Sequence, residues 1–121
     1  MGSAEERSQR GAPRLEVDGY LVIEDIHGRR KVHLVDISFG GFLVSSDAPY
    51  PVGHTQDFLF ATPDGQWTVP LRARAVHSYQ RNASGTPEYV SGFTFVNADA
   101  DSVQSRIQDV VDRVMGALSF S

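Results

Sequence analysis

The chain has 121 residues and a formal net charge of −4, with 40% hydrophobic residues, 21% charged residues and no cysteine. This length suffices for one globular domain with a core, and the acidic balance does not favour a polyanion such as DNA as partner. The absence of cysteine excludes a disulfide framework and a thiolate metal site. No apolar run approaches the roughly 18 residues of a membrane span, so neither membrane insertion nor a secretory signal is expected, and we predict a cytoplasmic protein.

Residues 1–13 are polar, and we predict that they form a flexible N-terminal arm ahead of a folded domain over residues 14–118. Arg7, Arg10 and Arg14 lie in or next to this arm. Local positive charge on an acidic body suits a small anion better than a nucleic-acid backbone. A solvated surface is the alternative interpretation of such a cluster.

Alternating apolar and polar residues after the arm predict six short strands separated by turns. The strands are expected at residues 14–23, 31–37, 40–47, 55–62, 66–79 and 89–96. The strongest turn signals are Gly28, the pair Asp64-Gly65 and the stretch 81–88. Pro70 lies inside the fifth predicted strand, which indicates an edge position or a bulge there.

The last segment changes to the period of an amphipathic helix, predicted at about residues 99–118. Its apolar stripe consists of Val103, Ile107, Val110, Val111, Val114 and Leu118. Asp99 and Asp101 stand at its start, where carboxylates favour the helix dipole. Six strands followed by one helix predict a mainly β fold, a small antiparallel barrel that the C-terminal helix covers.

Two short motifs carry the candidate chemistry. Arg10 and Arg14 form an Arg-x-x-x-Arg arrangement where the arm meets the first strand, and the loop DISFGG contains Asp36, Ser38 and Gly41 as Asp-x-Ser-x-x-Gly. In this order, and on this strand plan, the two motifs resemble those of the PilZ domain, a bacterial receptor for cyclic di-GMP.

The last predicted strand adds to the resemblance, because SGFTF, with Gly92, Phe93 and Phe95, is similar to the Gly-x-x-Phe pattern common in that family. The resemblance covers roughly residues 7–118. It implies a six-stranded PilZ-type β-barrel with a C-terminal helix. It also implies a cyclic di-GMP receptor or adaptor without enzymatic activity or cofactor, whose ordered arm changes the surface offered to a partner protein. The alternative is a ligand-free PilZ-like module that only binds proteins.

The motif residue types suit a guanine dinucleotide. The guanidinium groups of Arg10 and Arg14 match the O6/N7 edge of guanine and also pair with phosphate. The carboxylate of Asp36 can accept from the N1–H and N2–H₂ groups on the other edge, and Ser38 adds a hydroxyl contact. Gly41 either lets a ligand approach the backbone closely or holds a left-handed turn.

Gln9, Gly40 and Arg7 are further candidates for the ligand site. Many relatives carry a second arginine directly before the first motif arginine, where this chain has Gln9. In the family this region influences whether one ligand or an intercalated pair binds, so the stoichiometry stays open. Arg7 replaces the missing arginine only if the arm bends suitably.

Other polar and aromatic residues are assigned to structure. The histidines (His27, His33, His54 and His77) show no metal-ligand spacing, and Ser38 lacks the elbow and paired base of a nucleophile. Trp67 and the phenylalanines of FLF and FTF are expected in the core, rather than as a stacking platform. Arg72 and Arg74 should share one strand face, which either extends the ligand site or faces water. Residues 29–31 are expected to be a solvated basic turn.

Overall fold

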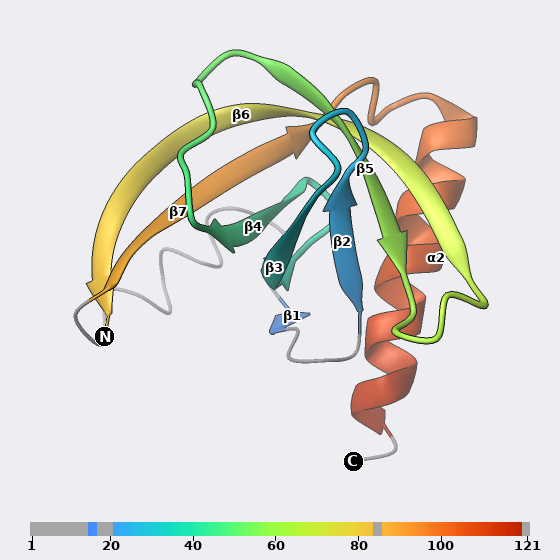
Figure 1. The fold of residues 1–121 in the computed structure, drawn as a ribbon. Helices are drawn as coiled ribbons and strands as arrows, with labels where there is room; N and C mark the ends of the chain where they lie inside the picture. The colour runs from blue at the N-terminus through green and yellow to red at the C-terminus, as the bar shows by residue number, and fades with distance from the viewer. Residues whose placement is uncertain (1–14, 17–20, 84–85, 120–121) are drawn as a thin grey trace, which may run out of the picture.

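The computed structural model describes residues 15–16, 21–83 and 86–119, so Arg7, Gln9, Arg10 and Arg14 lie outside the described residues, as does the predicted arm. Figure 1 shows strands that curve around a common core and a long helix beside them. The elements are β1 (Leu15–Glu16), β2 (Val22–Asp25), β3 (Arg30–Ile37), β4 (Gly41–Ser46), β5 (Thr55–Ala61), β6 (Thr68–Ala83), β7 (Thr86–Phe95) and α2 (Asp101–Ser119).

Six strands close into an antiparallel barrel, as predicted. The order is β3-β2-β5-β6-β7-β4, and pairing of β4 with β3 completes the ring. The prediction of one continuous first strand is wrong: it consists of β1 and β2, which pair with different parts of the same edge of β3. Residues 23–25 of β2 lie opposite residues 30–32, whereas Leu15 and Glu16 lie opposite Ile37 and Asp36.

The predicted turn at residues 81–88 is confirmed in position but is shorter than expected, because antiparallel pairing continues through residues 81–83 and 86–88. β6 extends to Ala83 and β7 begins at Thr86, which is its register partner. The side chains of Arg81 and Glu88 form an ion pair across the two strands. Cross-strand pairing of this kind overrides the local turn signals.

Two other local predictions are confirmed. Gly65 has a positive φ of 76° in the turn between β5 and β6, and its amide donates to the Thr62 carbonyl. Pro70 pairs with Leu59 of β5, but β7 pairs with β6 only from Ala73 onward. Pro70 therefore occupies a stretch of β6 that is locally an edge, where its missing N–H breaks no ladder.

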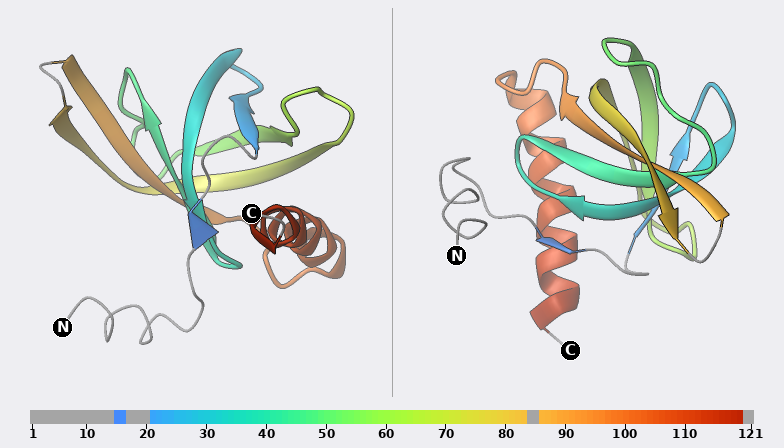
Figure 2. Two further views of the ribbon diagram at one scale, coloured as in Figure 1. Left: turned by 90° about the horizontal axis from the view of Figure 1, so that it is seen from below. Right: turned by 90° about the vertical axis from the view of Figure 1, so that its left-hand side faces the viewer.

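The core is built from the inward-facing residues of the barrel and the apolar stripe of α2, which lies beside the barrel (Figure 2). Phe42 is at its centre, with ring centroids 5.1–5.4 Å from those of four other phenylalanines, Phe58, Phe60, Phe93 and Phe95. The predicted helix residues Ile107, Val110, Val111 and Val114 are buried. The assignment of FLF, FTF and this stripe to the core is confirmed, and Trp67 packs partly buried against the same cluster.

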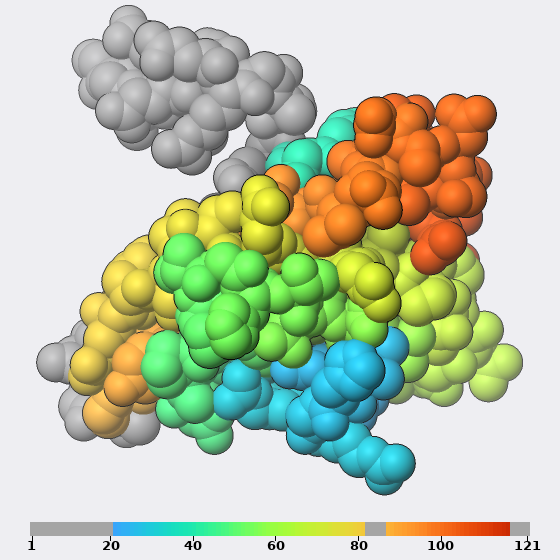
Figure 3. Space-filling model, turned by 90° about the horizontal axis from the view of Figure 1, so that it is seen from above, coloured from blue at the N-terminus to red at the C-terminus, as the bar shows by residue number. Residues whose placement is uncertain are grey.

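The upper end of the barrel is covered by the connection between β4 and β5 (Figure 3), which carries the buried Tyr50. The Arg30 guanidinium carbon lies 4.5 Å from the centre of the Tyr50 ring, and the Tyr50 hydroxyl donates to the buried carboxylate of Asp25. Burial raises the pKa of the Tyr50 phenol, and the hydrogen bond and charge of Arg30 oppose this only in part. The prediction of a solvated turn is therefore wrong for Arg30, whereas Arg29 and Lys31 are exposed.

We predict that Ile107→Ala lowers the free energy of unfolding by ~2–5 kcal/mol, because truncating a side chain that is 2% exposed leaves a cavity between α2 and the barrel. Chemical denaturation measures this. Asp109→Ala on the exposed face of the same helix is the control, expected within ~0.5 kcal/mol of the parent chain. Equal effects of the two substitutions would show that α2 does not complete the core.

Candidate ligand-binding face

The Asp-x-Ser-x-x-Gly motif forms the turn that joins β3 to β4. The Ser38 amide donates to the Gly41 carbonyl at 2.8 Å, which closes the turn. The Ser38 hydroxyl, which is buried, donates to the same carbonyl and accepts from the Gly40 amide, each at 3.4 Å. Ser38 thus stabilises the backbone of its own turn. The sequence alone does not distinguish this structural role from a contact to a ligand.

Gly41 is required by the contact between β4 and β7. A Cβ built on Gly41 would collide with the carbonyl oxygen of Phe93, a backbone atom that cannot move aside. The glycines with positive φ in the described ranges are Gly53 and Gly65, so the left-handed turn considered for Gly41 is wrong. Gly40, in contrast, has open space around its Cβ position.

The turn is also tied to the end of β7. The Gly40 carbonyl accepts from the Phe95 amide and from the Thr94 hydroxyl, both at 3.2 Å. Phe39 at the tip is 45% exposed, and with residues of α2 it lines a hollow of about 160 Å³ between turn and helix. The backbone of the turn is therefore fixed, while its apolar tip faces outward.

β1, which follows the Arg-x-x-x-Arg motif in the sequence, pairs with the part of β3 that begins the Asp-x-Ser-x-x-Gly motif. Leu15, the residue directly after Arg14 in the sequence, lies opposite Ile37, and Glu16 lies opposite Asp36. The described residues that follow the first motif in the sequence thus pair with the start of the second motif. The pairing also places Asp36, which is half-buried, next to β1 at the outer surface of the barrel.

A row of outward-facing residues crosses the barrel from Asp36. Four buried residues on neighbouring strands are register partners, each of the next: Ile37, Phe42, Phe93 and Ala75. Their side chains point into the core. On β3, β4 and β7 the adjacent residues of the row face outward because side chains alternate along a strand, whereas on β6 a bulge after Ala75 makes His77 the partner of Gly92. Register pairing gives this outer row as Asp36, Leu43, Gly92 and His77.

The two ends of this row follow irregularities in the strands. The β3–β4 register shifts between Leu34 and Asp36, and the β6–β7 register shifts between Ala75 and His77. Such bulges change the direction of the side chain that follows and are frequent next to functional sites. Asp36 and His77 therefore owe their orientation to an extra residue in each strand, which the alternation of the sequence does not reveal.

His77 was not among the predicted site residues. Its imidazole fills the place of the missing Gly92 side chain, because a Cβ on Gly92 would collide with the ring. The Tyr79 ring lies roughly parallel to it, with centroids 6.2 Å apart and an interplanar angle of 28°. A glycine inside a strand indicates that another group approaches the backbone closely. Gly92 therefore signals a contact of this kind, in addition to its place in the Gly-x-x-Phe pattern.

A sequence model of the PilZ domain matches residues 8–113 of the chain. The chain belongs to the PilZ domain family. No sequence among the curated proteins matches it. The matched region includes the motif turn and the outer row of this PilZ domain. Asp36 and Gly40 are accessible at this turn, whereas Ser38 and Gly41 are buried within it.

Solved structures with the same fold share little sequence with this PilZ domain. The Klebsiella pneumoniae MrkH–c-di-GMP complex has a TM-score of 0.68 at 11% identity, covering 93% of this chain and 55% of that chain. The Borreliella burgdorferi PlzA protein in complex with c-di-GMP has a TM-score of 0.58 at 5% identity, covering 94% and 56%. The uncharacterized Legionella protein Lpg0364 has a TM-score of 0.58 at 13% identity, covering 88% and 98%. The chain thus spans about half of MrkH and PlzA.

Two features are absent from the described part of the chain. None of its helices is long and apolar enough to cross a membrane. No group of three or more histidine, aspartate or glutamate side chains in the described ranges is arranged to hold a metal ion.

We predict that Gly41→Ala destabilises the domain by ~1–3 kcal/mol or more, because the added methyl group forces β4 away from the β7 backbone. The matched control is Gly40→Ala one residue earlier, where a methyl group meets no atom within 4 Å and stability should change by less than ~0.5 kcal/mol. Thermal unfolding of both variants tests this. Equal melting temperatures would contradict the close approach at Gly41.

Proposed function

We propose that this PilZ domain is a receptor for cyclic di-GMP that acts by binding rather than by catalysis. The single observation that carries the proposal is the β1–β3 pairing, which brings the residue after Arg14 opposite Ile37, next to Asp36. The residue types of the two motif halves, Arg-x-x-x-Arg before β1 in the sequence and Asp-x-Ser-x-x-Gly after β3 begins, suit guanine and phosphate. MrkH and PlzA, which share the fold, form complexes with c-di-GMP, which supports the same ligand here.

In this proposal, Arg10 and Arg14 contact the guanine O6/N7 edge and the phosphates, and Asp36 accepts from the opposite edge of a guanine. Ser38 and Gly41 hold the turn that presents Asp36, and Gly40 leaves the approach to the backbone open. Gln9 and Arg7 stay candidate contacts. Binding orders the predicted arm over the barrel and so changes the surface offered to a downstream protein.

The expected affinity follows from two opposing contributions. Charge-assisted and bidentate contacts each favour binding, whereas ordering each backbone residue of the arm costs ~1–2 kcal/mol. A dissociation constant near micromolar, which corresponds to about −8 kcal/mol, is a reasonable expectation. A single dinucleotide should also give a shallow salt dependence, unlike the steep one of a nucleic-acid surface.

We predict that Arg10→Ala and Arg14→Ala each weaken cyclic di-GMP binding by ~1–3 kcal/mol, the scale of one bidentate base contact. Titration calorimetry measures affinity and stoichiometry, with GTP as the ligand control. Lys31→Ala is the matched control, since it removes an exposed positive charge from β3, the strand that carries Asp36. Saturable binding that both arginine variants retain unchanged would refute the assigned roles. Absence of heat and of a thermal shift in the parent chain would favour the ligand-free interaction module.

The outer row suggests that the ligand reaches as far as His77. Three strand spacings separate β3 from β6, on the order of 14 Å, comparable with the length of an extended cyclic dinucleotide. Leu43 lies between the ends of the row, and the His77 ring beside Tyr79 offers an aromatic surface to a base. We therefore extend the proposed binding face from Asp36 across β4 and β7 to His77.

We predict that His77→Ala weakens cyclic di-GMP binding by ~1–3 kcal/mol, the range for loss of one aromatic contact to a base. His77→Phe should retain most of the affinity, because a planar ring remains over Gly92. The control is His54→Ala, which removes an exposed histidine directly before β5. If His77→Ala binds as tightly as His54→Ala does, the ligand face ends before β6.

A further inference from the structure

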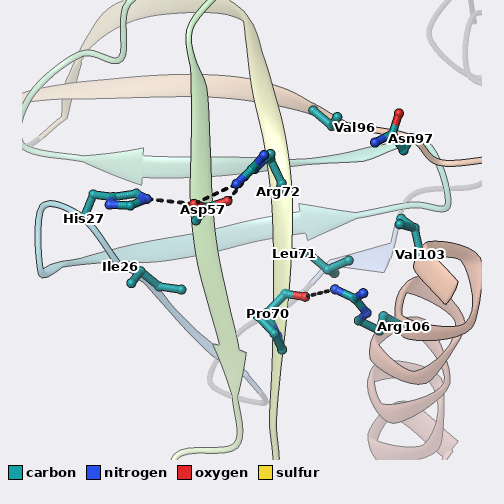
Figure 4. Close-up of a pocket in the computed structure, with 10 residues that line it drawn as sticks. All are labelled: Ile26, His27, Asp57, Pro70, Leu71, Arg72, Val96, Asn97, Val103 and Arg106. Atoms are coloured by element: carbon teal, nitrogen blue, oxygen red, sulfur yellow. Dashed lines mark hydrogen bonds and ion pairs between the residues drawn. The ribbon is translucent and has the colours of Figure 1, made fainter.

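A second candidate site lies beyond the end of β7, away from the outer row. It is a groove of about 440 Å³ between β5, β6, the β2–β3 turn and the first turns of α2 (Figure 4). This volume lies within the usual range of ligand pockets. Its polar lining consists of His27, Asp57, Arg72, Asn97 and Arg106, all outside the motif that carries the proposed function.

The charged groups on one wall are held together by Asp57. Its carboxylate accepts from Arg72 Nε at 2.8 Å and from Arg72 Nη2 at 3.4 Å, and it lies 2.7 Å from His27 Nε2. The hydrogen bond from Arg72 first, and that from His27 second, hold the pKa of Asp57 below its usual range. Asp57 therefore stays ionised near neutral pH, and it fixes the direction of the Arg72 guanidinium.

The other wall carries a second oriented guanidinium. Arg106 Nη1 donates to the Pro70 carbonyl at 3.2 Å, in the stretch of β6 that has no β7 partner. Arg72 and Arg106 thus each use part of their donor set on the protein, and both side chains are exposed. The lining contains two guanidinium groups and one carboxylate, that of Asp57, so positive charge is in excess there.

Apolar side chains line the groove between these groups. Ile26 is 41% exposed at the β2–β3 turn, and Leu71, Val96 and Val103 contribute from β6, the segment after β7 and α2. A groove with two oriented guanidinium groups and apolar walls matches a carboxylate next to an apolar side chain. Pre-oriented donors reduce the ordering that binding requires.

We propose that this groove docks an acidic segment of a partner protein, with one carboxylate at Arg72 and Arg106 and a neighbouring apolar side chain against Leu71 and Val103. Charge complementarity favours this occupant, because a guanidinium group presents several donors to a carboxylate and the apolar walls suit a peptide side chain beside it. The groove is open along the exposed residues Pro70 and Arg72, as a passing peptide chain requires.

The groove is connected to the motif turn through two consecutive amides. The Phe95 amide donates to the Gly40 carbonyl of the turn, and the Val96 amide donates to the Arg72 carbonyl in the groove. A partner in the groove therefore contacts the strand end that also holds the turn. The docking proposal itself does not require cyclic di-GMP, and its test is made without that ligand.

The test is an NMR titration of the isotope-labelled full chain with the blocked hexapeptide EELFEE. Saturable shifts are expected for the amides of Leu71, Arg72, Val96 and Val103. The peptides KKLFKK, with reversed charge, and EEGGEE, without apolar side chains, should each bind at least fivefold more weakly. Equal binding of EEGGEE, no saturable shifts, or shifts confined to other surfaces would overturn the proposal.

Three variants locate the contact. Arg72→Gln and Arg106→Gln should each weaken EELFEE binding at least fivefold. Arg74→Gln, two residues along the same face of β6 but outside the groove, should leave it unchanged. The Arg106 variant leaves the Asp57 pairs intact, so its result stands even if Arg72→Gln disturbs the fold. Equal affinities in all three variants would refute the assigned roles of both arginines.

Discussion

The barrel depends on the close approach of β4 and β7 at Gly41, where the Phe93 carbonyl oxygen occupies the space of a side chain. This contact lets Phe42, the next residue, reach the centre of the aromatic core. It also fixes the start of β4, and with it the turn that carries Ser38 and Gly40. The motif glycine is therefore a condition for closing the sheet, and the geometry of the candidate site follows from that closure.

Patterns that depend on burial alone were predictable from the sequence. The stripe of Ile107, Val110 and Val114 predicted the helix within two residues at its start, because only one face of an amphipathic helix can enter the core. The alternation of Arg72 and Arg74 with alanines likewise predicted one outer face of β6. In each case the spacing of residues in the sequence determines which side chains lie on the same face.

Features that depend on pairing between distant segments were not predictable. Residues 81–88 have the composition of a turn, yet residues 81–83 pair with residues 86–88 in the ladder between β6 and β7, where Arg81 and Glu88 form an ion pair. Arg30 belongs to a basic run, yet it lies on Tyr50 because a distant connection folds over the barrel end. His77 reaches the outer row only through a bulge that no local pattern marks.

The hydrogen bonds of Phe95 and Val96 make the end of β7 the junction between the two surfaces. Gly40 and Arg72 each accept from one of two consecutive amides, so a shift of the strand end along its axis would change both bonds together. The next residues lead into α2 through Asn97, whose φ of 56° marks a sharp change of direction. Because α2 is anchored in the core by its buried stripe, it resists such a shift. The turn and the groove are therefore bonded to the same short segment at the end of β7, and the packing of α2 against the core keeps that segment in place.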